Sequence, residues 1–325
     1  METYESLREW KDQNIMSYLK DTISLNDFHD QVMQHVMHIA KSKLKEEPPC
    51  NFTWFITGSG GRREQGLISD QDHGIIYEKS DKEYEEYFKV LGEELAFGLH
   101  AVGYPYCQGN VMSSNPLWCK SAGHWKSQLE EWMREESWEA IRHLQIFFDA
   151  RTLCGDQCYI NELKLFIYQF QLGHSSLLRR FSANIEHVKN VIGPVGQILV
   201  EQHGKYQGCV NLKYAAFLPY VNAVRLLSIK EGIYETSTLS RIVQLKHSSK
   251  YDKMLQNCEK NFLDLLKYRI SLIQIENYTD THYLRIHNLT KEERKEIKRI
   301  LKDGKRLHEE VIALTSYKKD VGDGI

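Results

Sequence analysis

The sequence lacks the features of a chain that crosses a membrane or folds around disulfides. No run approaches the roughly 18 apolar residues that a membrane-spanning helix needs, and the first residues, METYESLREWKDQ, are too charged for a signal peptide. The seven cysteines are an odd number with no CxxC pair, which argues against a disulfide framework and a zinc site. These absences predict a cytoplasmic protein with reduced thiols and no membrane contact.

An excess of charge of one sign is also missing. Lysine and arginine number 42 against 44 aspartates and glutamates, giving a net charge of -2. A nucleic-acid-binding surface is usually basic, so no nucleic-acid partner is expected.

The fourteen histidines form no HExxH motif, and the dipeptide His29–Asp30 has no histidine cluster to support a metal-dependent hydrolase. We therefore expect His29 and Asp30 on a helix surface.

Prolines are few, only six, so each break in a helical pattern is informative. Pro48 and Pro49 end a helical region whose apolar positions recur at helical spacing after Ser24, the expected N-cap. Strand-like apolar runs follow at 52–57, 73–78 and 143–148. From about 162 onward the pattern is helical, and the last helix begins at a capping box of Thr290 and Glu293.

This pattern predicts an α+β chain with three parts. An N-terminal helical segment covers 1–50, a small mixed-sheet domain covers 51–160, and a helical bundle domain covers 161–325. The sheet domain contains the stretch that is richest in chemistry, FITGSGGRREQGLISDQDHGIIYE, at 55–78.

Two carboxylates stand one residue apart in this stretch. Residues i and i+2 of a strand point to the same face, so Asp70 and Asp72 should project together. Adjacent carboxylates repel and raise each other's pKa, a penalty that a divalent cation removes. Asp149, expected at the end of the strand-like run 143–148, would add a third carboxylate and allow a two-metal site. Oxygen ligands of this kind favour Mg²⁺, with Mn²⁺ as an alternative.

The turn GSGG precedes the two aspartates. Glycines such as Gly58 let backbone N–H groups approach a phosphate closely. Ser59 can donate its hydroxyl, and Arg62 and Arg63 offer charge-assisted hydrogen bonds to phosphate oxygens. The pattern is neither a P-loop, since no GK[ST] follows, nor the GxGxxG fingerprint, since Arg63 stands where the third glycine belongs.

The segment GSGGRREQGLISDQDHGIIY resembles the nucleotidyltransferase domain of the polymerase β-type superfamily. It is most similar to a bacterial family of nucleotidyltransferases related to the protein-PII uridylyltransferase. Further similar blocks are GYPYCQGNVMSSNPLW (103–118), FFDARTLCGD (147–156), NLKYAAFLPYVNAVRLL (211–227) and GIYETSTLSRI (232–242).

The resemblance implies transfer of a nucleoside monophosphate from UTP or ATP to an acceptor hydroxyl, with release of pyrophosphate. The acceptor would be a small molecule or a protein, for example a regulatory protein in signal transduction. Gly58 and Ser59 would hold the triphosphate, and Asp70, Asp72 and Asp149 the metal. Asp149 would also activate the acceptor. Asp156 lies nearby on the same segment and is the alternative for this third carboxylate, but Asp149 is preferred because it follows the apolar run directly.

Several points stay open at the level of sequence. Lys213 is either a nucleotide contact from the helical domain or an ordinary surface lysine, and His73 either orients a ligand or lies on the far face of its strand. The hydrolase and amino-acid-sensing domains of the bifunctional uridylyltransferase are not expected in this length. A catalytically silent nucleotide-binding module is the alternative function, and an oligomer is compatible with the sequence.

Overall fold

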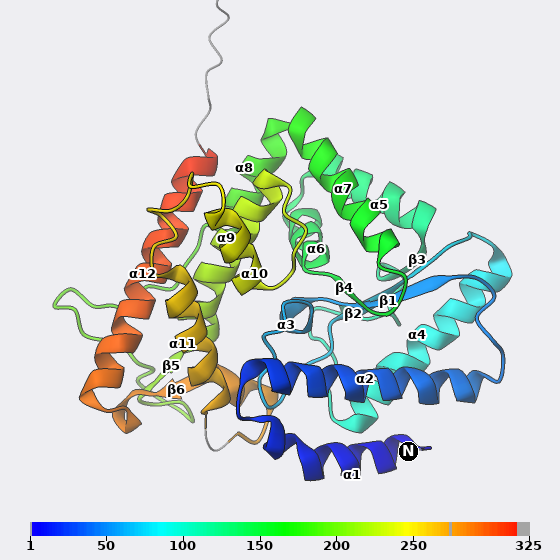
Figure 1. The fold of residues 1–325 in the computed structure, drawn as a ribbon, viewed down its shortest axis with the longest axis horizontal. Coiled ribbons are helices and arrows are strands. Elements are labelled where there is room, and N and C mark those ends of the chain that lie inside the picture. Colours follow the sequence, from blue (N-terminus) through cyan, green and yellow to red (C-terminus); the bar gives the residue numbers. More distant parts are fainter. Residues whose placement is uncertain (1, 273–274, 317–325) are drawn as a thin grey trace, which may run out of the picture.

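The computed structural model describes residues 2–272 and 275–316 and forms a four-stranded sheet with helices on both faces (Figure 1). The strands are β1 (Phe52–Ile56), β2 (His73–Tyr77), β3 (Cys119–Ser121) and β4 (Arg151–Gly155), in the order β3-β2-β1-β4. β1 runs antiparallel to β2 and β4, whereas β2 and β3 are parallel. The predicted α+β class with a mixed sheet is confirmed.

The register of β1 and β2 positions the functional stretch. Ile56 at the end of β1 pairs with His73 at the start of β2. The glycine turn that follows β1 and the aspartates that precede β2 therefore lie at the same end of the sheet. A slip of one residue would reverse the faces of all these side chains, so the buried pattern of the strands also fixes the site.

Successive residues of the two central strands enter two different hydrophobic cores, as the two-residue period of a strand requires. Trp54 and Ile75 pack among the helices on one face, whereas Phe55 and Ile76 pack on the other. The first face is covered by α1 (Tyr4–Asn14), α2 (Thr22–Leu44) and α4 (Lys82–Val102), and the second by α5 (Ala122–Glu135), α6 (Trp138–Phe148) and α7 (Cys158–Gly173).

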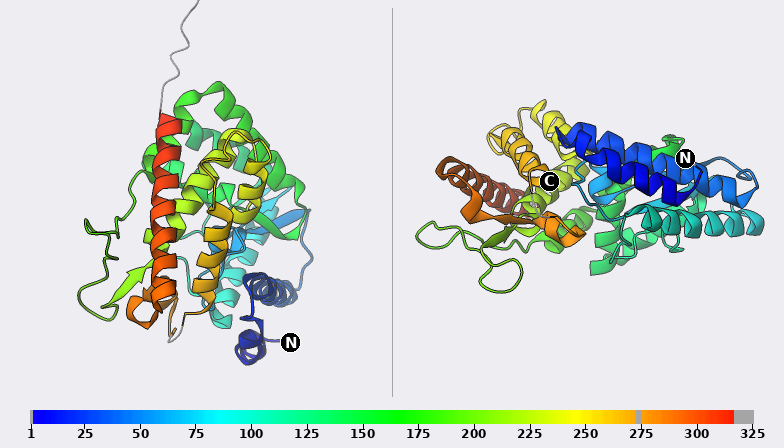
Figure 2. Two further views of the ribbon diagram at one scale, coloured as in Figure 1. Left: turned by 60° about the vertical axis from the view of Figure 1, so that its left-hand side comes forward. Right: turned by 90° about the horizontal axis from the view of Figure 1, so that it is seen from below.

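The C-terminal part is mostly helical, as predicted (Figure 2). It contains α8 (Ser175–Ile185), α9 (Leu218–Glu231), α10 (Thr238–Lys246), α11 (Cys258–Ile270) and α12 (Lys291–Ser316), with a two-stranded ribbon of β5 (Cys209–Asn211) and β6 (Tyr283–Arg285). This part also contains the short helical turns η2 (Lys213–Phe217, a π-helix), η3 (Tyr278–His282) and η4 (Ile286–Asn288). A further short turn, η1 (Ile15–Tyr18), lies between α1 and α2 in the N-terminal part.

One hydrophobic core joins the sheet to the C-terminal helices. It includes Phe55 and Ile76 of the sheet together with Val224 of α9 and Ile297 of α12. The domain boundaries near 50 and 160 therefore stay predictions, because packing is continuous across the second of them.

Of three local predictions, the structure corrects two and confirms one. The apolar run 143–148 is the end of helix α6, capped at Ser137, and the strand β4 begins only after it. A short buried apolar run is compatible with helix and strand alike, which explains the error. The N-cap of α2 is Asp21, whose carboxylate accepts from the Ser24 N–H at 2.8 Å. The Thr290–Glu293 capping box is confirmed.

The dipeptide His29–Asp30 is buried, not exposed as predicted. His29 lies 2.8 Å from the Tyr104 hydroxyl and 3.0 Å from the Gly66 carbonyl. Asp30 binds Arg151 of β4 at 2.6 Å. Both residues therefore attach α2 to the sheet domain.

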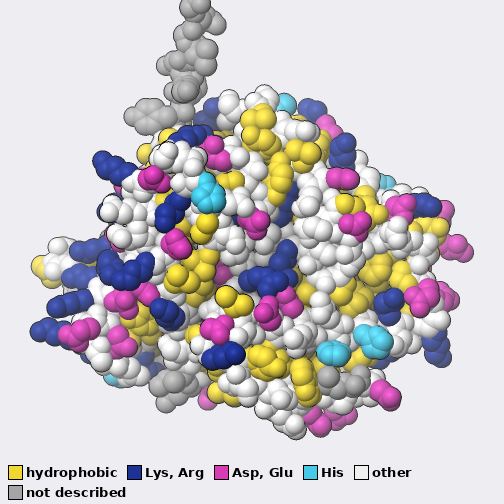
Figure 3. All heavy atoms as spheres, viewed as in Figure 1, with side chains coloured by type: hydrophobic (Ala, Val, Ile, Leu, Met, Phe, Trp, Pro, Cys, Tyr) yellow, Lys and Arg dark blue, Asp and Glu magenta, His cyan; other side chains and the backbone are white. Residues whose placement is uncertain are grey.

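The surface carries both signs of charge. In Figure 3, basic and acidic side chains alternate over the described part of the face shown.

In 2–272 and 275–316, no helix combines the length and the apolar character needed to cross a bilayer. All seven cysteines are free thiols.

The buried His29 predicts a pH-dependent stability. Burial lowers the pKa of His29 from 6.5 to about 4, so between these values the unfolded chain takes up a proton that the native chain excludes. The contribution of His29 to the unfolding free energy is fully present above pH 6.5. It is lost as the pH falls, at about 1.4 kcal/mol per pH unit. His29→Gln should flatten the pH dependence of the unfolding free energy, measured by urea denaturation between pH 7 and 5.

His38→Gln is the matched control, since His38 lies exposed on the same helix. An equal pH dependence in wild type and His29→Gln would contradict the assignment of a buried neutral imidazole.

Candidate functional site

The glycine turn forms a short helix, α3 (Gly58–Gly61), directly after β1. Gly58 has a φ of +57°, in the left-handed region that favours glycine. A Cβ atom at this position would also lie 2.1 Å from Oδ2 of Asp72. The turn therefore approaches the second aspartate so closely that only glycine fits.

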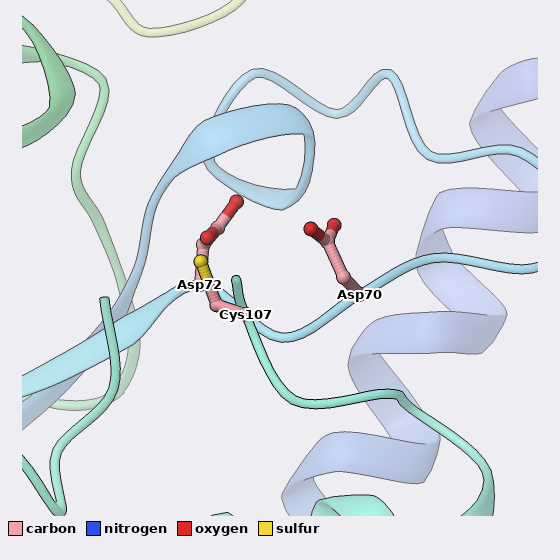
Figure 4. A group of neighbouring side chains, drawn as sticks. All are labelled: Asp70, Asp72 and Cys107. Atoms are coloured by element: carbon pink, nitrogen blue, oxygen red, sulfur yellow. The ribbon is translucent and has the colours of Figure 1, made fainter. Parts of the chain in front are cut away.

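The structure brings Asp70 and Asp72 together immediately before β2 (Figure 4). The backbone of Asp72 accepts from the Thr57 N–H at 2.9 Å, which fixes it against the end of β1. One ligand atom each from Asp70, Asp72 and Cys107 all lie within 4.8 Å of one another, and all three residues are half-buried. Within the described ranges this is the group of acidic, histidine and cysteine side chains able to hold a metal ion.

The environment makes the doubly charged pair unfavourable without a cation. Burial and the nearby Asp72 raise the pKa of Asp70 to about 7, and burial also raises the pKa of Asp72. Burial and the Asp72 carboxylate raise the pKa of Cys107 to about 12. In the absence of a bound ion, Cys107 is therefore a neutral thiol at physiological pH.

Two residues of the C-terminal part face the pair. Lys213 of η2 and Tyr278 of η3 both act on the Asp70 carboxylate and lower its pKa against the larger opposing effects. The Lys213 ammonium lies 5.5 Å from the centre of the Tyr278 ring. Lys213 is thus no ordinary surface lysine, because burial lowers its pKa while Asp70 and Asp72 raise it.

A buried arginine near the pair is only partly compensated. Arg269 of α11 is 8% exposed and stacks on Phe217 at 4.8 Å, and its Nε has no hydrogen-bond partner among the residues described. His282 of η3 likewise leaves Nε2 without a partner in that part of the chain. A buried polar group without a partner is costly, so both atoms are suited to meet a ligand.

Sequence reasoning missed Arg269, Tyr278, His282 and Cys107. The first three lie in a helical region where no local motif marks them, and their role becomes visible only through burial and proximity. Cys107 lies within a block that carries the family resemblance, but a thiol is not an expected partner of a hard cation.

The residues predicted to bind phosphate have different environments. Ser59 is 9% exposed, with its Oγ 3.5 Å from that of Ser69. Arg62 donates to Glu64 at 2.8 Å and to Asp149 at 2.7 Å.

Arg63 turns away from the site, contrary to the prediction. Its half-exposed side chain binds Asp27 of α2 at 2.8 Å, and its second guanidinium nitrogen lies 3.7 Å from Asp30. The carboxylates of α2 thus take the place of the expected phosphate.

Asp149 does not join Asp70 and Asp72, which corrects the expectation of a third metal ligand. It is the C-cap residue of α6, 1% exposed, and three arginines surround its carboxylate. Burial alone would raise its pKa, but Arg225, Arg241 and Arg62 hold the pKa of Asp149 well below the usual range. A carboxylate so strongly paired is a poor proton acceptor and has no free oxygen for a metal.

His73 belongs to the core and not to the site. It is fully buried and accepts at Nδ1 from the Trp54 indole at 3.1 Å, while Nε2 lies 2.9 Å from Gln71. Burial lowers its pKa to about 3, so it remains neutral.

Comparison with known proteins agrees with this architecture. Residues 16–139 match the family model described as "Putative nucleotidyltransferase DUF294", and residues 175–313 match its "nucleotidyltransferase substrate binding domain". A search of curated proteins returns no match. The first match covers the glycine turn and both aspartates, and the second covers Lys213 and Arg269. The chain belongs to the DUF294 nucleotidyltransferase family and carries that family's C-terminal substrate-binding domain.

Proposed function

We propose that the protein is a metal-dependent nucleotidyltransferase that moves a nucleoside monophosphate from UTP or ATP to an acceptor hydroxyl. The acceptor oxygen would attack the α-phosphorus, the bond from the α-phosphorus to the bridging oxygen would break, and pyrophosphate would leave. The acceptor would be a protein or a small molecule, in a reaction similar to that of the protein-PII uridylyltransferase.

The observation that carries this proposal is the pairing of Asp70 with Asp72 beside the glycine turn. Their ligand atoms lie within 4.8 Å, and glycine at position 58 lets the turn approach Asp72, because a Cβ atom there would collide with the Asp72 carboxylate. Positive charge from Arg62, Lys213 and Arg269 acts on this pair. The site thus combines two carboxylates that can bind a cation with positively charged side chains that can bind a polyphosphate. Phosphoryl transfer requires both.

The pair fits a hard divalent cation. Asp70 and Asp72 would hold Mg²⁺ or Mn²⁺, whose remaining positions would go to water and phosphate oxygens. When bound, the ion would stabilise negative charge on the transferring phosphate. Cys107, as a neutral thiol, would support Asp72 and leave the cation to the carboxylates.

The residues of the C-terminal part would act on the triphosphate. Lys213 and Arg269 would neutralise phosphate oxygens, and the Tyr278 hydroxyl would orient Asp70. The catalytic effect would come from positioning the two reactants and from charge stabilisation. ATP and UTP are intracellular substrates, and the seven free thiols agree with the cytoplasmic location that we propose.

A catalytically silent nucleotide-binding module is favoured by one specific observation. Asp149 is fully occupied by arginines, so the expected acceptor-activating carboxylate is missing from the pair. Such a module would bind the nucleotide and signal to a partner without turnover.

The two candidates differ in their products. Incubation with Mg²⁺ or Mn²⁺ and each of the four α-labelled NTPs should yield pyrophosphate and a labelled acceptor or labelled protein if the enzyme is active. A thermal-shift titration with the same nucleotides reports binding alone. Binding without pyrophosphate, in the presence of cell extract as a source of acceptors, would favour the silent module.

Asp70→Asn tests the carboxylate pair. We expect transfer to fall by about 100-fold or more, because an electrostatic group of the transition state is lost. The metal-free melting temperature should stay equal or rise, because one of two mutually repelling acids is removed. Labelled-NTP transfer and differential scanning calorimetry measure the two effects.

Asp156→Asn is the matched control, since Asp156 is exposed and lies outside the pair. Unchanged transfer by Asp70→Asn would contradict the role of the pair.

Arg269→Met tests the buried guanidinium. Removal of a partly uncompensated buried charge should maintain or raise the unfolding free energy. The affinity for NTP should fall about 10- to 100-fold, the equivalent of one charge-assisted hydrogen bond. Urea denaturation and isothermal titration calorimetry report these opposite changes.

Arg134→Met, at an exposed arginine that pairs with Glu130 and lies 5.6 Å from the centre of the Phe170 ring, controls for the general loss of positive charge. Loss of stability with full NTP affinity in Arg269→Met would show that Arg269 is structural.

A further inference from the structure

Asp149 is the centre of a buried cluster of charges. Its Oδ1 accepts from Arg241 at 2.7 Å and from Arg225 at 3.0 Å. Its Oδ2 accepts from Arg225 at 2.6 Å and from Arg62 at 2.7 Å. Two carboxylate oxygens thus receive four charge-assisted hydrogen bonds, which is close to their full capacity.

The three arginines come from separate elements. Arg62 caps the C-terminus of α3, with its backbone N–H donating to the Gly58 and Gly60 carbonyls. Arg225 lies on α9 and Arg241 on α10. One carboxylate at the end of α6 therefore connects the glycine turn to two helices of the substrate-binding domain.

The turn α3 stands between the metal pair and this cluster. A Cβ atom at Gly58 would lie 2.1 Å from Oδ2 of Asp72, and one at Gly61 would lie 2.1 Å from the backbone oxygen of Asp149. A shift of Asp149 would therefore move the turn relative to Asp72.

Arg225 and Lys213 belong to one continuous helical segment. The π-helical turn η2, which begins at Lys213, passes directly into α9, which contains Arg225. Twelve residues separate the two, or about 18 Å of helix rise. Anchoring Arg225 thus sets where the start of this segment presents Lys213 to Asp70 and Asp72.

The charge balance of the cluster makes Asp149 indispensable for this arrangement. Glu64 compensates Arg62 at 2.8 Å and also accepts from Thr238 of α10. Three guanidiniums therefore face two carboxylates, an excess of one positive charge. Arg241 is fully buried, so removal of the Asp149 charge would leave it and Arg225 facing each other without compensation.

We propose that Asp149 is a positioning residue, a clamp that holds the phosphate-binding turn and the helix of Lys213 in the one arrangement that binds NTP. This inference rests on the proposed function for its ligand, but the clamp itself is a property of the described residues. It replaces the role of metal ligand and acceptor activator that the sequence had indicated for Asp149.

A double-mutant cycle with Asp149→Asn and Lys213→Ala tests the clamp through NTP affinity. Asp149→Asn should weaken NTP binding about 10-fold or more and leave Mn²⁺ affinity within about 2-fold, because only the arrangement is lost. Lys213→Ala should have less than half its wild-type effect in the Asp149→Asn background. Additive effects of the two changes, or wild-type NTP affinity in Asp149→Asn, would overturn the proposal.

A second variant keeps the test decisive if Asp149→Asn alone fails to fold. Asp149→Asn combined with Arg241→Met removes one negative and one positive charge and should restore the melting temperature. NTP affinity should stay low, because Arg225 and Arg62 have lost their common anchor. Recovery of NTP affinity in this pair would overturn the proposal.

Hydrogen exchange separates the clamp from the proposed function. Asp149→Asn should increase amide exchange about 10-fold or more in 58–62 and 213–225, with Asp156→Asn as the control. Unchanged exchange there would contradict the clamp. Failure of the wild type to bind any NTP would contradict the proposed function and leave the exchange result to decide the clamp.

Discussion

Repulsion between two half-buried carboxylates is the constraint on which this site depends. The pairing of β1 with β2 places Asp70 and Asp72 at one end of the sheet, and burial raises the pKa of both. The fold tolerates this cost where Lys213 and Tyr278 face the pair. A chain that needed only a stable core would gain from replacing either acid with a neutral residue.

Two charge clusters of opposite character lie on either side of the turn α3. On the side of Gly58, the carboxylates of Asp70 and Asp72 lie together, and we propose that a cation binds there. On the side of Gly61, three arginines surround Asp149, and the excess charge is positive. The glycines of α3 allow both clusters to approach the same turn. An anionic triphosphate held at this turn would offset the positive excess on the Gly61 side, and a divalent cation would offset the carboxylates on the Gly58 side.

The parts of the site that lie close together in sequence could be predicted from it. The glycine turn and the DQD motif are local, and the two acids do lie together as expected, but in the irregular segment that precedes β2 and not within the strand from which their common direction was predicted. The contribution of Asp149 was not predictable, because an apolar run that ends in an acid reads alike as helix and strand. The prediction that Arg63 contacts phosphate was wrong for a related reason. Nothing in the local sequence shows that Asp27 and Asp30 lie beside Arg63. Arg269 and His282 are recognised only by buried nitrogens that have no hydrogen-bond partner among residues 2–272 and 275–316, which no sequence pattern records.

In the function that we propose, Asp70 and Asp72 together bind a divalent cation. The most direct measurement is a titration of the protein with Mn²⁺, followed by the electron paramagnetic resonance signal of the free ion, in wild type and Asp72→Asn. We expect one or two bound Mn²⁺ ions in the wild type, with release of protons near neutral pH, and loss of this binding in Asp72→Asn. Equal Mn²⁺ binding by both proteins, or none by the wild type in the presence of NTP, would contradict it.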